Sequence, residues 1–154
     1  MRTVAATAAE IAYTEAVRTI TRQQDVVDGL RTRAGTLFAG AALVTAFLGG
    51  QALSRDPTFD VVTWIAIGAF VALFALTLVI LWPWPFRFAL SAQILIEDHL
   101  EKDVAELQVY VAEIWEKNYH LNQPRVDALH WVFRAACAAL SLEVVAWLIS
   151  IGRG

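Results

Sequence analysis

The sequence predicts an all-α protein with three transmembrane helices and two amphipathic cytoplasmic helices. The chain of 154 residues is 58% hydrophobic and 18% charged, whereas soluble domains average about 45–50% apolar and about 25% charged residues. The charges crowd between long uncharged stretches, and apolar residues within the charged parts recur with a helical period. The length suits one domain. A net charge of −3 argues against a nucleic-acid partner.

Residues 1–33 are predicted to form a cytoplasmic amphipathic helix. Its apolar row, interrupted by one polar residue at Gln23, advances in alternating steps of four and three: Ala9, Tyr13, Ala16, Ile20, Gln23, Val27 and Leu30. Such a helix is stable only when its apolar side is covered. Residues 1–15 have no apolar core of the length that a cleavable signal peptide needs. We therefore expect the first membrane span to act as the insertion signal.

Residues 34–83 are predicted to form a transmembrane hairpin with spans at 34–53 and 61–82. Both spans lack ionisable residues, and each has about the 20 residues needed to cross a bilayer. Pro83 and Pro85 are expected to end the second span, because proline lacks a backbone donor. The first span carries a row of small residues: Gly35, Ala39, Ala42, Ala46 and Gly50. Small residues allow close helix packing, either within one chain or between copies.

Residues 84–127 are predicted to form the second cytoplasmic segment, with an amphipathic helix from about residue 91 to 121. Its apolar row is Leu100, Val104, Leu107, Val111 and Ile114. Asn122, Gln123 and Pro124 are expected to break this helix before the third span. The apolar rows of the two cytoplasmic helices either cover each other within the chain or pair between subunits.

Residues 128–154 are predicted to form a third transmembrane helix and a short external tail. Glu143 falls near the middle of this span, where an acidic side chain is costly and marks a functional or packing site. It is a buried, hydrogen-bonded or protonated group, a pore or ion-path residue, or half of an interhelical ion pair. Arg134 comes nine residues earlier and therefore lies on the opposite face of the same helix. The two side chains cannot pair within one helix. His130 and Trp131 are expected at the lipid interface.

The basic residues predict the orientation of the spans. Nine of them lie before the first span or between the second and third, whereas the short loop and the tail hold only Arg55 and Arg153. The positive-inside rule then places the N-terminus and the long loop in the cytoplasm and the C-terminus outside, as in a bacterial inner membrane. Five tryptophans near the span ends are expected at the headgroups: Trp64, Trp82, Trp84, Trp131 and Trp147.

Recognisable catalytic and cofactor motifs are absent from the sequence. It has no glycine-rich phosphate loop, nucleophile elbow, HExxH or CxxC motif. His99 has no second histidine at ligand spacing. We therefore expect no enzyme activity, no catalytic residue, no cofactor and no metal site.

The entry into the first span resembles that of small bacterial membrane effectors, the SLATT and Pycsar transmembrane effector families. The resemblance rests on the layout of residues 14–121 and on one stretch: Asp25-Val26-Val27-Asp28-Gly29-Leu30-Arg31-Thr32-Arg33-Ala34-Gly35-Thr36-Leu37. The third span, with Glu143, departs from the two-span layout of those families. The resemblance implies an oligomer that disrupts the inner membrane when a cytoplasmic sensor protein or a nucleotide signals infection.

These observations lead to two expectations of function. The first is an oligomeric pore-forming or membrane-perturbing effector, as in antiphage defence, with Glu143 as its polar lining. The second is a structural or accessory membrane subunit whose cytoplasmic helices dock a soluble partner. In both cases we expect the lipid bilayer as a partner and a homo-oligomer as the working form.

Overall fold

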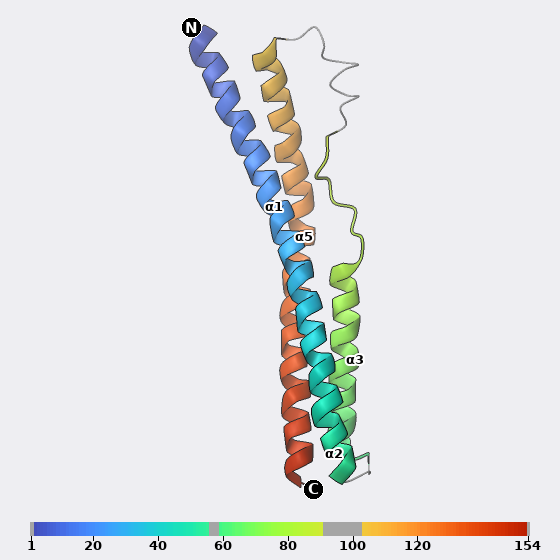
Figure 1. The fold of residues 1–154 in the computed structure, drawn as a ribbon. Coiled ribbons are helices and arrows are strands. Elements are labelled where there is room, and N and C mark those ends of the chain that lie inside the picture. The colour runs from blue at the N-terminus through green and yellow to red at the C-terminus, as the bar shows by residue number, and fades with distance from the viewer. Residues whose placement is uncertain (1, 56–58, 91–102, 154) are drawn as a thin grey trace. The chain divides into compact units, whose positions relative to one another are not determined.

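A computed structural model describes residues 2–55, 59–90 and 103–153, and this part of the chain contains helices and connecting segments but no strand. The elements are α1 (Arg2–Val44), the π-helix η1 (Thr45–Gly49), α2 (Gly50–Arg55), α3 (Val61–Leu81) and α5 (Val104–Arg153) (Figure 1). Three helical stretches are long and apolar enough to cross a membrane, which confirms the predicted number of such helices.

The contacts divide the chain into two compact units. We call residues Met1–Val27 and Trp84–Asp127 the polar unit, and residues Asp28–Pro83 and Ala128–Gly154 the apolar unit. The long helices α1 and α5 contribute residues to both units.

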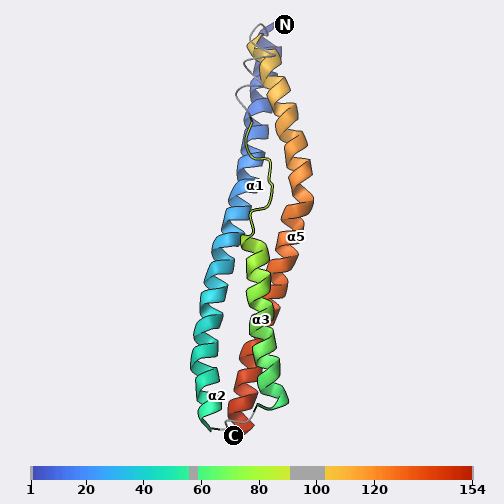
Figure 2. The ribbon, with the colours of Figure 1, turned by 90° about the vertical axis from the view of Figure 1, so that its right-hand side faces the viewer.

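In the polar unit, α1 and α5 lie next to each other (Figures 1 and 2). Most of the predicted apolar row of α1 that belongs to this unit is buried, including Ile20 and Val27, whereas Tyr13 is exposed. On α5, Val111 is buried and Val104 is exposed. The predicted start of this helix, with Leu100 and His99, lies outside the described residues. The two helices therefore cover each other within one chain.

The expected break at Asn122, Gln123 and Pro124 is wrong. Helix α5 continues through Pro124, so the predicted second cytoplasmic helix and the predicted third span form one helix. Proline removes one backbone hydrogen bond and crowds the preceding turn, but a helix can continue when other contacts hold it. Such contacts are present on both sides of Pro124.

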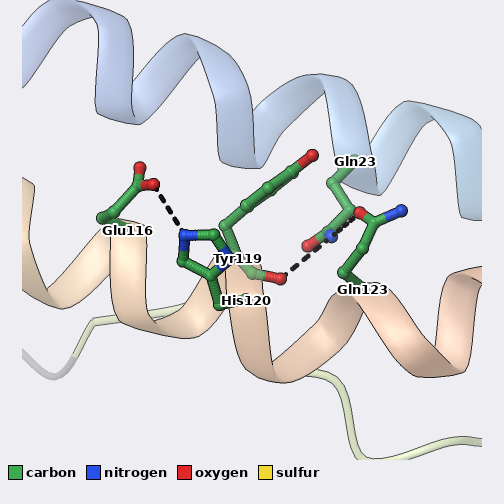
Figure 3. A network of polar contacts seen from close by, with 5 residues as sticks. All are labelled: Gln23, Glu116, Tyr119, His120 and Gln123. Carbon is green, nitrogen blue, oxygen red and sulfur yellow. Dashed lines mark hydrogen bonds and ion pairs between the residues drawn. The ribbon is translucent and has the colours of Figure 1, made fainter.

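The first contact comes from α1. The side-chain amide of Gln23 donates to the Tyr119 carbonyl at 3.2 Å and to Oε1 of Gln123 at 3.1 Å (Figure 3). Gln23 is buried despite its polarity. One turn earlier on α5, His120 Nε2 lies 2.9 Å from Glu116 Oε1. The turn before the proline is thus held by a side chain from another helix.

The second contact comes from the segment that follows α3. Asn122 is fully buried and accepts from the Arg87 N–H at 3.1 Å, while its amide donates to the Arg87 carbonyl at 3.4 Å. Arg125 Nη1 donates to the Pro85 carbonyl at 2.9 Å. The residues that suggested a helix break are therefore the points where other segments attach to α5.

In the apolar unit, the second half of α1 with η1 and α2, the helix α3 and the C-terminal half of α5 run side by side (Figures 1 and 2). Asp60 caps α3 by accepting the Thr63 N–H at 2.8 Å, and α3 ends at Leu81, just before Pro83 as expected. The inward face of α3 is Thr63, Ala66, Ala69, Leu73, Thr77 and Ile80. The Phe38 ring of α1 lies 6.0 Å from Phe70 and 5.4 Å from Phe74 between centroids.

One end of the apolar unit is closed by polar contacts. Arg55 Nη1 donates to the Ile151 carbonyl at 3.3 Å, and Arg153 Nη1 lies 3.9 Å from Asp60 Oδ2. The two basic residues assigned to the external side thus connect the hairpin to the end of α5.

Candidate functional site

The candidate site is a polar contact inside the apolar unit, between Glu143 on α5 and Thr45 at the start of η1. The Thr45 hydroxyl donates to Oε1 of Glu143. The Glu143 side chain is fully buried, and no group in the described part of the chain donates to its Oε2. A buried carboxyl group with a free oxygen is costly unless a proton, water molecule or cation compensates it.

The backbone on the α1 side of this contact is irregular. Residues Thr45–Gly49 form a single π-helical turn between α1 and α2. π-Turns of this kind occur mostly as single-turn bulges and are frequent at functional sites. This widened turn begins at Thr45, which binds Glu143, so the irregular backbone and the buried carboxyl group meet at one place.

The same turn ends in a close contact with a tryptophan ring. A Cβ atom on Gly49 would lie 3.0 Å from Cζ2 and 3.2 Å from Cη2 of Trp147. Trp147 is 2% exposed and lies one helical turn after Glu143, on the same side of α5. Only glycine fits at residue 49 while the ring keeps this position.

The surroundings of the site are apolar. Trp147 packs with the buried Ala52, Ala66 and Ala146, and further apolar side chains pack around this cluster: Val44, Leu48, Val62, Ile67 and Ile151. Three other buried polar atoms of the apolar unit have no hydrogen-bond partner within the described ranges: Nε of Arg31, Oγ1 of Thr77 and Nε1 of Trp147. The apolar unit therefore encloses polar groups that are not fully satisfied.

The position of Trp147 corrects one expectation. Its place near a span end suggested an interfacial ring, but it is buried against Gly49. The reason is the pairing of helices, because a ring near a span end can turn either to the headgroups or to a neighbouring backbone. Trp64, Trp82 and Trp131 are exposed.

Arg134 does not meet Glu143. Its guanidinium carbon lies 4.9 Å from the centre of the Trp131 ring, one turn earlier on α5, which is within the range of a cation–π contact. Arg134, Trp131 and His130 are all exposed. The three residues form the outer surface of the first turns of α5 in the apolar unit.

The predicted row of small residues on the first span is not the row that packs within the chain. Ala39, Ala46 and Gly50 are exposed, Gly35 and Ala42 are half-buried, and a Cβ added to Gly35 or Gly50 would meet nothing within 4 Å. The small residues that pack inside are offset along the helix: Ala34, Ala41, Gly49 and Ala52. The predicted row leaves an open surface on the apolar unit.

Sequence reasoning found Glu143 but missed Thr45, Gly49 and Trp147. A hydroxyl-bearing residue in an apolar span and a glycine pair at 49–50 were available signals. Neither shows which helix faces Glu143. No group of three or more metal-binding side chains occurs within the described ranges.

Comparison of the chain with protein-family models, with curated proteins and with solved structures found no match.

Proposed function

We propose that this chain is a multi-pass protein of a bacterial inner membrane that assembles as a homo-oligomer and makes the bilayer permeable when its Glu143 site opens. The observation that carries the proposal is the buried carboxyl group of Glu143, held by one hydroxyl group and facing one irregular turn. In the closed conformation the Thr45 hydroxyl donates to one of the two carboxyl oxygens, Oε1. In the open conformation water reaches the other carboxyl oxygen, Oε2.

The irregular turn supports such a change. A π-turn has fewer favourable backbone contacts than a regular helix, so a shift of Thr45–Gly49 to regular helical geometry is within reach. That shift would rotate Thr45 away from Glu143 and move Gly49 relative to Trp147. A carboxyl group released in this way gains free energy by contact with water.

The open surface of small residues supports assembly. A row with Ala39, Ala46 and Gly50 exposed lets a helix of a second copy approach closely. Assembly is necessary for the proposed activity because three spans do not enclose a pore. The distribution of basic residues favours a cytoplasmic N-terminus. The proposed function suggests a membrane-perturbing effector of antiphage defence. The entry into the first span resembles that of such effectors.

The experiment measures leakage of a self-quenched dye from liposomes that contain the purified protein. Thr45→Val removes the hydroxyl group that holds Glu143 and should raise the leakage rate, by about threefold to tenfold for a lost hydrogen bond. Thr36→Val is the matched control, because the Thr36 hydroxyl group donates to the Thr32 carbonyl of its own helix at 3.1 Å. The proposal fails if Thr45→Val liposomes stay as tightly sealed as protein-free ones.

A second measurement tests the role of the carboxyl group. In planar bilayers under a KCl gradient, the open form should prefer cations, and Glu143→Gln should abolish this preference because it removes the negative charge.

Light scattering in detergent gives the oligomeric state. Ala46→Leu should reduce it, whereas Ala135→Leu, at an exposed alanine of α5 outside the row, should not. A monomeric wild-type protein would contradict the proposal.

A second function, an accessory subunit that docks a soluble partner, is favoured by a different observation. An open groove lies between α1 and α5 in the polar unit. This second function gives the apolar unit a purely structural role. It predicts that no variant of Thr45 or Glu143 changes permeability.

A further inference from the structure

A groove runs between α1 and α5 in the polar unit. Its larger part has a volume of about 600 Å³ and continues into a neighbouring part of about 390 Å³, since Val109 and Glu113 line both. Small residues from both helices line it: Ala9, Ala12, Ala16, Ala105 and Ala112. Alanines on both walls leave room for a third helix to approach the two backbones closely, as in helix-in-groove recognition.

The rim of the groove is acidic. Glu15, Glu106, Glu113 and Glu116 line it, against Lys117 and His120. Glu15 faces Arg18 at 3.5 Å and Glu116 faces His120 at 2.9 Å, whereas no ion pair of Glu106 or Glu113 occurs within the described residues. These two carboxylates are seven residues apart, so they lie on one side of α5, two turns from each other. They match basic side chains at the same spacing on an opposing helix.

The charge of the polar unit narrows the choice of occupant. The sequence of this unit contains 11 acidic and 7 basic residues, a net charge of −4. An anionic nucleotide would meet repulsion at this rim, because phosphate groups are bound by Arg, Lys and helix N-termini. The polar unit of a second copy carries the same negative charge and is disfavoured for the same reason.

We propose that this groove docks a basic amphipathic helix of a partner protein, with apolar residues against the alanines and Lys or Arg against Glu106 and Glu113. The inference does not rest on the permeability activity proposed above. It identifies the cytoplasmic partner as a cationic protein segment and not as a nucleotide.

The test measures fluorescence anisotropy of labelled helical peptides with the full chain in a neutral detergent. The probe is an amphipathic peptide with Leu on one face and Lys on the other, and its counterpart carries Glu in place of Lys. Glu113→Lys should weaken binding of the Leu/Lys peptide by about tenfold, because it replaces an attraction by a repulsion. Asp25→Lys changes the net charge equally, at an exposed residue that does not line the groove, and should leave the affinity within about twofold.

Three outcomes overturn the proposal. The first is no binding of the Leu/Lys peptide, and the second is binding that both substitutions weaken equally. The third is self-association of the polar unit that Glu113→Lys alone disrupts, which assigns the groove to a second copy. Circular dichroism of both variants shows that the helices remain folded. None of these measurements involves permeability, so they fail or succeed independently of the Glu143 experiments.

Discussion

The polar and apolar units use the same two long helices but hold them together by different means. In the polar unit, side-chain amides reach across to backbone groups, as Gln23 does to Tyr119 and Asn122 to Arg87. In the apolar unit, a tryptophan ring lies against the backbone at Gly49, and Thr45 binds a buried glutamate. Directional bonds select one pairing where water competes, whereas close packing dominates where the surroundings are themselves apolar.

The two units should therefore be destabilised by different substitutions. The apolar unit depends on the space at one glycine, and the polar unit depends on a few buried amides. Substitutions in one unit should leave hydrogen exchange of the other unchanged, because effects of distant sites are nearly additive.

The largest effect is expected at Gly49. Gly49→Leu places atoms where the Trp147 ring now lies, and this ring is buried. We expect a loss of about 3 kcal/mol in the free energy of unfolding, the upper end of what overpacking usually costs. Thermal unfolding in detergent micelles measures it. Gly40→Leu is the control, since a Cβ at Gly40 meets nothing within 4 Å. Equal destabilisation by both substitutions would show that the ring contact is not the cause.

A smaller effect is expected at Asn122. Asn122→Ala leaves the backbone N–H and carbonyl of Arg87 without their side-chain partner, at a cost of about 1–2 kcal/mol. Hydrogen exchange should show faster exchange of the Arg87 amide and unchanged protection in the apolar unit. Gln24→Ala, at an exposed position of α1, is the control. Loss of protection in α3 would contradict the separation of the two units.

The smallest effect is expected at Asp60. The N–H of Thr63 binds its carboxylate and lowers the pKa of Asp60 below its ordinary value. A lowered pKa stabilises the folded state above the pKa of the unfolded chain, and this contribution is lost as the pH falls through the pKa of the folded protein. Asp60→Asn keeps a helix-capping side chain but does not titrate. Acidification through this window should therefore destabilise the wild type more than Asp60→Asn, as followed by thermal unfolding. Parallel curves for the two proteins would contradict this assignment.

Local patterns predicted a large part of the fold. Hydropathy alone identified three helices of spanning length, and Pro83 correctly marked the end of α3 at Leu81. The four-three spacing identified residues of α1 that are buried, such as Ile20 and Val27. Hydropathy also drew attention to Glu143, because an acidic residue inside an apolar stretch is visible in one sequence.

The site itself depends on how the helices are rotated and aligned, which a single helix does not encode. The backbone of Pro124 by itself predicted a helix break. Contacts from Gln23 and Arg87 nevertheless hold α5 continuous around this residue. The tertiary structure likewise decided that Thr45 is the partner of Glu143 and that Trp147 turns inward to Gly49. The sequence by itself thus determined which segments are helical and apolar, because hydropathy and backbone restrictions act within one segment. Only the tertiary structure decided which groups meet, because the free energy of each contact belongs to two segments at once.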